Sequence, residues 1–422
     1  MRNAVKAAQW GERGGGYKVP WARDQADGKV ACESTTFRCL RLFIRPSLFG
    51  LLVPAAEQAN YWSTACGMLK LSCQLYPTSA EEIAAIVRIL NANNETFAIK
   101  SGGHNPNQGF SSIDGGPLIL TRELNEVIYD AASGTVRVAL GNEWEDVIGA
   151  LEGTGVTVAG GRIGDVGVGG LVLGGGLSFL STQYGLVANN IGPTNYSIAT
   201  LYTIKAHPQG QIWGGNIIYT PDKTPEILAA VRDFTEYYPD DKAGINITIE
   251  LTQFGVIDMW LMFLFYEGPT PPAGVFDNFT AIAHLNTTES VINAAGLIRS
   301  IASQPIPKRL ARKAKEMGGD LLDLDDDIDR IILEFDSSWL STLDNKRMNA
   351  ATQKLYIGSK NLVDQYQGQG KLTEAYLPLF ANDAYYRQNY FGRLRTADFA
   401  RRVRDEYDPT GFFASRTGGW KM

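Results

Sequence analysis

The sequence predicts an α+β protein in which alternating helices and strands precede an antiparallel sheet with helices on one face. Residues 77–153 alternate between apolar repeats of helical period and short runs of strand-forming residues. After residue 213, a helical pattern at residues 224–238 is followed by two consecutive strand patterns, at 245–251 and 259–266. Consecutive strands without an intervening helix favour an antiparallel sheet.

The first helix is predicted to open at Pro77-Thr78-Ser79, with Thr78 and Glu81 spaced as a capping box. Its apolar face carries Ile83, Ile86, Val87 and Leu90. The helix leads to a predicted strand at residues 96–100, and two further strands at 125–129 and 135–140 flank a turn. A second helix places its apolar residues Trp144, Val147, Ile148 and Leu151 on one side and is expected to end at Gly153.

Composition is that of a soluble enzyme. The chain has 422 residues, 44% of them hydrophobic and 20% charged, enough for two or three domains with their own cores. The net charge of -6 gives no basic footprint, so we do not expect a nucleic acid partner. No apolar run is long enough to span a bilayer, and we expect no membrane partner.

A glycine turn that contains a histidine follows the predicted strand at residues 96–100. In Ser101-Gly102-Gly103-His104-Asn105, the glycines allow backbone N–H groups to converge on an anion such as a diphosphate. His104 could then reach the ring of a phosphate-bearing cofactor. The chain has three histidines, and the other two are distant in sequence, so a multi-histidine metal site is not expected. A tight turn with a hydrogen-bonded histidine is the alternative interpretation.

A second run, residues 160–176, contains more glycine than an ordinary turn requires. Each glycine costs backbone entropy on folding, so we expect another group to lie close against this backbone. No register of the run supplies the G-x-G-x-x-G pattern that follows a strand in dinucleotide-binding domains. The pattern therefore disfavours a nicotinamide-dependent dehydrogenase.

Several long motifs occur together and in order: "FAIKSGGHN", "GFSSIDGGPLILTRELNEV", "GGRIGDVGVGGLVLGGGLSFLSTQYGLVANNI" and the tail "YDPTGFF…GGWKM". They resemble the FAD-linked oxidases of the berberine-bridge-enzyme-like group, in the vanillyl-alcohol-oxidase superfamily, and look most like its fungal members. The resemblance implies a two-lobed fold. Residues 61–213 would form the FAD lobe, 214–370 a substrate lobe with an antiparallel sheet, and 371–422 a segment that completes the FAD lobe. Residues 1–60 are unmatched.

The resemblance implies FAD as the cofactor, bonded covalently from His104 to the 8α-methyl position of the flavin. Relatives with two covalent links have a cysteine in the second glycine run, where this chain has Ile163, so one link is expected. The residues expected to bind FAD lie in the two glycine runs and near the C-terminus: Ser101, Gly102, Gly103, His104, Asn105, Gly109, Gly161, Gly164, Asp165, Gly167, Gly169, Gly170, Gly174, Gly175 and Asn382.

The resemblance also implies oxidation of a small organic substrate, with O2 as electron acceptor and hydrogen peroxide as product. Val166 occupies the position at which the family controls oxygen access, although a packed core valine is an equal interpretation. Asp383 matches the position of a catalytic tyrosine in plant relatives. It would serve as a base if burial raised its pKa, whereas a turn-forming role is the alternative. Tyr376 and Tyr386 are nearby substitutes.

One family segment is missing. Relatives carry a further stretch that lines the FAD site, and this chain is expected to lack it between Thr200 and Leu201. The leading hypothesis is an FAD-dependent oxidase or oxidative cyclase of secondary metabolism. The alternative is a degenerate, non-catalytic member that cannot hold FAD.

Secretion is expected from two features, with a cytoplasmic location as the alternative. Leu48–Ala56 resembles the core of a secretory signal, although an ordinary buried segment is equally compatible. Five N-x-[ST] sequons suggest a glycoprotein; they begin at Asn94, Asn195, Asn246, Asn278 and Asn286. The four cysteines are Cys32, Cys39, Cys66 and Cys73. The resemblance implies a disulfide between Cys73 and an upstream cysteine, either Cys32 or Cys39.

An acidic run at residues 323–329 partly matches a calcium loop, with Glu334 at the twelfth position. Ile328 stands where the loop needs glycine, so we interpret the run as a solvated acidic helix start.

Overall fold

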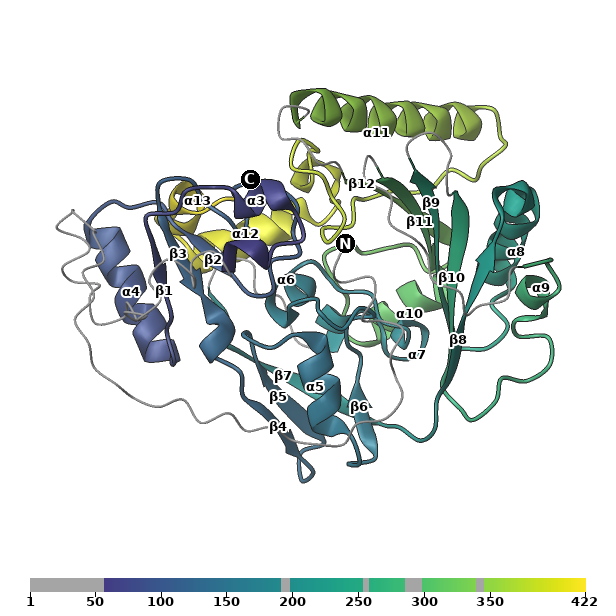
Figure 1. Cartoon of the computed structure of the whole chain (residues 1–422), viewed down its shortest axis with the longest axis horizontal. Helices are drawn as coiled ribbons and strands as arrows, with labels where there is room; N and C mark the ends of the chain where they lie inside the picture. Colours follow the sequence, from purple (N-terminus) through teal and green to yellow (C-terminus); the bar gives the residue numbers. More distant parts are fainter. Residues whose placement is uncertain (1–56, 191–197, 253–257, 285–297, 339–344) are drawn as a thin grey trace.

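The computed structural model describes residues 57–190, 198–252, 258–284, 298–338 and 345–422. It confirms the α+β class, with three sheets arranged in two lobes (Figure 1). The first lobe holds a parallel three-stranded sheet and an antiparallel four-stranded sheet. The second holds an antiparallel five-stranded sheet. The functional question is which residues these two lobes present to one another.

The parallel sheet has the order β1 (Cys73–Leu75), β3 (Pro117–Leu120) and β2 (Ala98–Lys100). Helix α4 (Ala80–Ala92) connects β1 to β2 and packs its apolar stripe on the sheet. Short helix α3 (Thr64–Gly67) precedes β1, and a 3-10 turn, η2 (Thr121–Glu123), follows β3. Because β2 ends at Lys100, the sheet delivers the first glycine run at its carboxyl edge.

Helix α4 begins one residue later than predicted. Ser79 is its N-cap, in an extended conformation, and its hydroxyl accepts a hydrogen bond from the Glu82 N–H at 3.2 Å. The Glu82 carboxylate accepts from the Thr78 N–H at 2.6 Å. The predicted box between Thr78 and Glu81 is therefore wrong. Either Thr78 or Ser79 could cap the helix chemically, and backbone geometry selects Ser79.

The four-stranded sheet has the order β4 (Val127–Asp130), β5 (Thr135–Ala139), β7 (Leu201–Pro208) and β6 (Val156–Val158). Helix α5 (Trp144–Leu151) packs on it, and Gly153 follows with φ of +77°, as the predicted helix end requires. The second glycine run leads through α6 (Val168–Leu173) to α7 (Ser181–Tyr184) and the 3-10 turn η3 (Val187–Asn190).

The expected junction of the missing segment lies beside this sheet. The Thr200 carbonyl accepts from the Leu140 N–H at 3.3 Å, and Leu201 at the start of β7 pairs with Ala139 of β5. The backbone therefore passes from Thr200 to Leu201 within regular pairing. Residues 191–197 are outside the described part of the chain.

The five-stranded sheet has the order β12 (Arg330–Ser338), β11 (Ile298–Ile306), β9 (Ala243–Thr252), β10 (Met259–Tyr266) and β8 (Trp213–Tyr219). Helices α8 (Thr224–Tyr237) and α9 (Asp277–Thr280) cover its outer face, preceded by the 3-10 turn η4 (Pro221–Lys223) (Figure 1). This confirms the antiparallel sheet with helices on one face.

The opposite face of this sheet is turned toward the first lobe and carries polar residues. Ser300 of β11 lies in register between Glu250 of β9 and Asp336 of β12, and Glu334 is two residues away from Asp336 along β12. Side chains two residues apart in a strand share a face. Helix α10 (Lys308–Glu316) follows β11, and the long α11 (Asn345–Gly368) lies across one end of the sheet (Figure 1).

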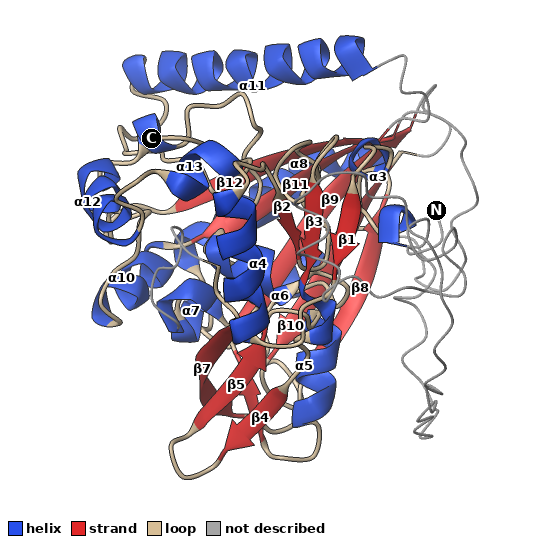
Figure 2. Ribbon diagram, turned by 90° about the vertical axis from the view of Figure 1, so that its left-hand side faces the viewer, coloured by secondary structure: helices blue, strands red, loops and turns tan. Residues whose placement is uncertain are grey.

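The C-terminal segment returns to the first lobe (Figures 1 and 2). It contains the 3-10 turn η7 (Phe391–Arg393) and helices α12 (Ala397–Tyr407) and α13 (Phe412–Arg416). The Phe97 N–H donates to the Arg416 carbonyl at 2.9 Å, and the rings of Phe97 and Phe412 lie 5.9 Å apart. The chain thus passes through the second lobe and closes on the first.

The acidic run at residues 323–329 is a loop, so the predicted helix start is wrong. Its carboxylates pair with basic side chains instead: Asp325 with Arg330 at 2.6 Å, Asp326 with Lys315 at 3.0 Å and Asp329 with Lys308 at 3.2 Å. Among the described residues, no group of three or more acidic, histidine or cysteine side chains is placed to hold a metal ion.

No helix in the described part of the chain is both long and apolar enough to cross a membrane. Leu48–Ala56, Cys32, Cys39, Asn195 and Asn286 lie outside the described residues. Cys73 is buried. Of the other sequons, Asn278 is exposed on α9, whereas Asn246 is half-buried within the central strand β9.

Candidate active site

The two glycine runs meet in direct backbone contact. A Cβ atom on Gly102 would lie 2.4 Å from the Gly167 nitrogen, and one on Gly167 would lie 2.2 Å from the Gly102 nitrogen. Ser101 joins the runs as well, because its hydroxyl donates to the Leu140 carbonyl at 2.6 Å and accepts from the Gly169 N–H at 3.3 Å. The glycines are thus required by close approach, as the sequence predicted.

Backbone N–H groups from both runs remain available at this junction. Gly103 has φ of +90°, which turns the chain sharply after β2. The N–H groups of residues 102–105 and 162–165 donate no hydrogen bond to any described residue. Backbone N–H groups without an acceptor in a glycine-rich turn can bind a diphosphate. The residues present therefore fit the phosphates of a dinucleotide cofactor.

His104 is held between the runs. Its Nε2 lies 3.5 Å from Oδ1 of Asp165, in the second run, and its ring stacks on Trp62 with centroids 5.2 Å apart. Burial lowers the pKa of His104 below its usual value, and the nearby Asp165 carboxylate opposes that shift. The imidazole is consequently neutral at neutral pH.

A buried ion pair supports the first run from behind. Lys100, with 2% of its side chain exposed, lies 3.2 Å from the carboxylate of Glu57, which also pairs with Arg122. The Lys100 ammonium lies over the Tyr61 ring, and a Cβ on Gly103 would lie 2.7 Å from Lys100 Cε. A paired buried charge is costly to disrupt, so this cluster fixes where the turn begins.

The second run packs against α5. A Cβ on Gly161 would lie 2.4 Å from the Trp144 ring, and a Cβ on Gly164 would lie 3.2 Å from Glu145. The Val166 carbonyl accepts from the Trp144 N–H at 3.1 Å, and the Val166 side chain packs against the core of the four-stranded sheet. This contact favours the packing interpretation of Val166. Ile163 is 53% exposed.

The C-terminal segment closes over both runs. The Asn382 side chain accepts from the Gly176 N–H at 2.9 Å and donates to the Leu171 carbonyl at 3.1 Å. A Cβ on Gly174 would collide with it, at 2.2 Å. Asn107 beyond the first run also contacts this segment: it donates to the Ala384 carbonyl at 3.1 Å and accepts from the Tyr386 N–H at 3.0 Å. Asp383 is thereby fixed beside the glycine runs.

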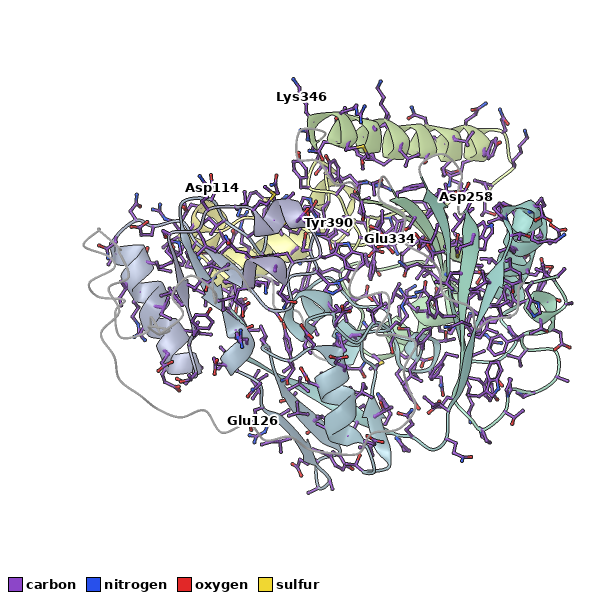
Figure 3. The ribbon with its side chains drawn as sticks, in the orientation of Figure 1. Asp114, Glu126, Asp258, Glu334, Lys346 and Tyr390 are labelled. Atoms are coloured by element: carbon purple, nitrogen blue, oxygen red, sulfur yellow. The ribbon has the colours of Figure 1, made fainter. Side chains whose placement is uncertain are left out.

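Gln304 of β11 joins Asp383 to the substrate lobe. Its amide nitrogen donates to Glu334 at 2.7 Å and to Asp383 at 3.1 Å, and its amide oxygen accepts from Arg162 at 2.5 Å. We call Arg162, Gln304, Glu334 and Asp383 the carboxylate cluster. Figure 3 shows Glu334 on the side of the sheet that faces the first lobe. The second glycine run and the C-terminal segment thus meet one face of the second lobe at this cluster.

The two carboxyl groups of the cluster and the neighbouring Asp336 have raised pKa values. Burial raises the pKa of Asp383 to about 7, with Arg162 opposing the shift and Asp336 adding to it. Burial and repulsion from Asp383 raise the pKa of Glu334 to about 7. Burial and the neighbouring Glu334 and Glu250 carboxylates likewise raise the pKa of Asp336 to about 7. Carboxyl groups with pKa values near the working pH are suited to proton transfer.

The two tyrosines proposed as substitutes point elsewhere. The Tyr376 hydroxyl accepts from the Arg395 N–H at 3.0 Å, and the Arg395 guanidinium lies 4.5 Å from the Tyr376 ring centre. The Tyr386 hydroxyl accepts from Arg387 at 2.8 Å on the exposed side of the segment. Neither hydroxyl contacts the carboxylate cluster.

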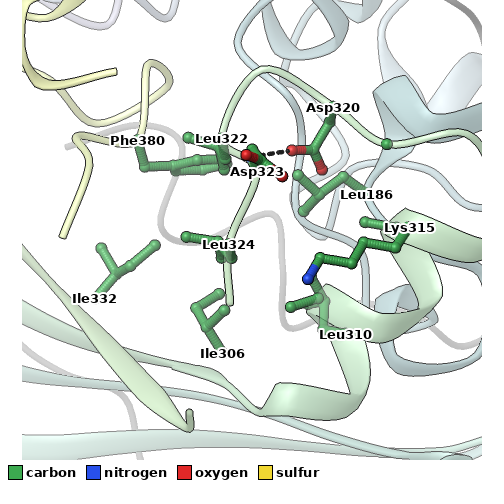
Figure 4. A pocket seen from close by; sticks show the side chains of 13 residues that line it. Leu186, Ile306, Leu310, Lys315, Asp320, Leu322, Asp323, Leu324, Ile332 and Phe380 are labelled. Atoms are coloured by element: carbon green, nitrogen blue, oxygen red, sulfur yellow. Dashed lines mark hydrogen bonds between the residues drawn. The ribbon is translucent and has the colours of Figure 1, made fainter. Parts of the chain in front are cut away.

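The remaining predicted glycines have different surroundings. A Cβ on Gly109 or Gly170 would have no other group within 4 Å, whereas Gly169 lies against Leu140 and Gly175 lies against Phe380. Behind Phe380, apolar side chains including Leu186, Leu322, Leu324 and Ile332 surround a cavity of about 20 Å³ (Figure 4). That volume suits about one water molecule, so the cavity is not a substrate site.

The sequence patterns did not identify four residues of this site: Arg162, Gln304, Asp336 and Trp62. Glu334 was considered only as a position in the calcium-loop pattern. One local signal existed for β12, because Glu334, Asp336 and Ser338 alternate with less polar residues and so share a face. A charged Arg162 inside a glycine run was a second signal.

Comparison with known proteins finds FAD-linked relatives of this chain. A family model described as an FAD binding domain matches residues 72–193. A protein named "Uncharacterized FAD-linked oxidoreductase" from Arthroderma benhamiae is 35% identical over 453 aligned residues, covering 87% of this chain and 90% of the relative. An "FAD-dependent monooxygenase" from Aspergillus calidoustus is 25% identical, covering 86% and 85%.

Solved structures agree on the fold. Berberine bridge enzyme from Eschscholzia californica superposes with a TM-score of 0.68 at 14% identity, covering 90% of this chain and 97% of that one. 6-Hydroxy-D-nicotine oxidase from Arthrobacter nicotinovorans gives 0.61 at 16% identity, covering 89% and 96%.

The fold and the paired glycine runs therefore define an FAD-linked oxidoreductase. The chain belongs to the FAD-linked oxidoreductase family of the Arthroderma protein and shares the fold of berberine bridge enzyme, as the motifs indicated. The alignment with the Arthroderma protein extends over 453 residues, more than the 422 of this chain, so that relative has residues without a counterpart here.

Proposed function

We propose that the protein is an oxidase that carries FAD covalently on His104 and removes a hydride from a small organic substrate bound against the carboxylate cluster. The observation that supports this proposal is the junction of the two glycine runs at Gly102 and Gly167, from which Arg162 of the second run reaches the Gln304 side chain that also binds Asp383. FAD supplies the hydride acceptor when bound. Residues 102–105 and 162–165 would hold its diphosphate, and Asn382 would hold the second run in place.

Asp383 is the proposed base. Hydride removal from an alcohol or amine carbon is easier when the attached O–H or N–H proton leaves as well. With a pKa of about 7, Asp383 is partly ionised at neutral pH and can take that proton. Gln304 keeps the carboxyl group in place, and Arg162 stabilises its ionised form. A secondary-metabolite substrate is supported by relatives such as a protein named bifunctional solanapyrone synthase, 28% identical over 57% of this chain.

Dioxygen is the proposed electron acceptor, with hydrogen peroxide as product, and Val166 would shape its approach. Anaerobic mixing with a panel of alcohols and amines tests the reaction class. A substrate should bleach the flavin absorbance, and admitted oxygen should restore the colour with one equivalent of peroxide. Bleaching that persists in oxygen would show that another acceptor is used.

Passage through the secretory pathway completes the proposal. The exposed Asn94 and Asn278 are the described sequons that could accept a glycan, whereas Asn246 is half-buried in strand β9.

Arg162→Leu should lower the rate of flavin reduction at neutral pH. Removal of the cation leaves the two carboxylates with less compensation, so their pKa values rise and the ionised base is present only at higher pH. The pH profile of flavin reduction should therefore move to higher pH. Arg88→Leu, on the exposed side of α4, is the control. A profile that stays in place would remove Arg162 from the site.

Restoring the missing family segment should raise the affinity for FAD. Ligand that binds only the native state stabilises it by mass action. Adding FAD should therefore raise the midpoint of thermal unfolding more in the restored chain than in the present one, when both carry His104→Ala so that binding is reversible. Equal shifts would show that the present chain has all the contacts that FAD needs.

A further inference from the structure

Asp165 contacts one edge of His104 and can only accept a hydrogen bond when ionised. Its Oδ1 lies 3.5 Å from Nε2, and the imidazole is neutral because burial lowers its pKa. An acceptor at Nε2 favours the tautomer with the proton on Nε2, which leaves the lone pair on Nδ1. The contact thus decides which nitrogen is nucleophilic.

Trp62 fixes the plane of the same ring. The Trp62 and His104 rings stack with an interplanar angle of 28°, and the Trp62 backbone N–H donates to the Gly103 carbonyl at 3.2 Å. Trp62 is therefore tied to the glycine turn by its backbone and to the imidazole by its ring. It is 56% exposed, more than an aromatic side chain held only by core packing would be.

We propose that Asp165 and Trp62 are positioning residues for flavin attachment: together they hold His104 with Nδ1 as the atom that bonds to the flavin methyl carbon. This rests on the proposed covalent function. The new bond joins Nδ1 to the 8-methyl carbon as one methyl C–H bond breaks. Nε2 gives its proton to Asp165, which passes it on, so the flavin ring system gains the methyl proton, the imidazole proton and the two electrons of the broken C–H bond. Dioxygen then takes both electrons and both protons and becomes hydrogen peroxide.

The experiment measures attachment itself. Protein from riboflavin-limited cells is mixed with FAD in air, and the fraction of flavin that stays with the acid-precipitated chain is followed over time. Asp165→Asn keeps the side-chain size, but its amide can donate to Nε2 and favour the wrong tautomer. Asp165→Glu keeps the carboxylate. Trp62→Phe keeps a stacking ring and Trp62→Ala removes it. Asp405→Asn, exposed and remote, is the control.

We expect attachment at least tenfold slower in Asp165→Asn and in Trp62→Ala, with substantial recovery in Asp165→Glu and in Trp62→Phe. FAD released by acid should show that all variants still bind the cofactor reversibly. Attachment at the wild-type rate in Asp165→Asn would overturn the role of Asp165, and equal rates in the two Trp62 variants would overturn that of Trp62. Wild-type protein that binds FAD but never attaches it would refute the attachment proposal while leaving the oxidase proposal intact. Failure to bind FAD at all would refute both.

Discussion

Asp383→Asn should slow flavin reduction by roughly a hundredfold or more, the size expected for loss of a positioned general base. The amide has nearly the same volume and can still contact Gln304, but it cannot take a proton. Because the interaction is made in the transition state, the chemical rate should fall while substrate binding changes little. Rapid anaerobic mixing, with flavin content verified first, measures this rate.

Two variants sharpen that result. Glu334→Gln should retain fast reduction with little change in its pH dependence, because burial, Arg162 and Asp336 set the pKa of Asp383. Glu374→Gln, on an exposed loop, should behave as wild type. If Asp383→Asn lost flavin and stability together, Asp383 would be a structural residue. If Glu334→Gln were the slow variant, the base would be Glu334.

His104→Ala should abolish acid-stable flavin and leave FAD bound reversibly. The attachment atom is lost, whereas the backbone N–H groups at residues 102–105 and 162–165 remain. Acid precipitation followed by flavin fluorescence of the pellet and the supernatant measures both forms. The acid pellet should contain about one flavin per chain in the wild type and none in His104→Ala.

His284→Ala is the matched control, since His284 is exposed and lies beside Tyr219 in the other lobe. It should keep its flavin in the pellet. Acid-stable flavin in the His104 variant would mean that attachment occurs at a different side chain.

Local patterns predicted the cofactor half of the site. Glycine runs are contiguous in sequence, and the close approach of Gly102 to Gly167 is what their glycine content indicated. Helix α8 and strand β10 were predicted nearly to the residue, because α8 has a clear apolar period and β10 is a continuous apolar run of strand length. Asn382 was expected from motif similarity to bind FAD, and in the structure it contacts the second run.

The substrate half could not be predicted in this way. Gln304, Glu334 and Asp383 lie on separate segments, and only strand register and the C-terminal return bring them together. Strand β11 was missed because its inward face is polar and Pro305 weakens the strand pattern. The stacking of Trp62 on His104 has no local signal either, since α3, β1, α4 and β2 separate them in sequence.

Covalent attachment also explains how a shortened chain could keep its cofactor. The Arthroderma relative has residues without a counterpart here, and if these line FAD, as the resemblance implies, the reversible contacts of this chain would be fewer. A bond to His104 would hold the flavin regardless of its reversible affinity. The tether and the deletion are thus linked in the proposed function, and a variant without the tether should reveal the weakened binding.

The flavin content of the purified wild-type chain is the most direct test of this account. Absorbance of the intact protein, followed by acid precipitation, measures total and attached flavin in one sample. We predict a yellow protein with about one FAD per chain, retained in the pellet. A correctly folded chain that is colourless and stays colourless after incubation with FAD would contradict the account and establish a non-catalytic member of the family.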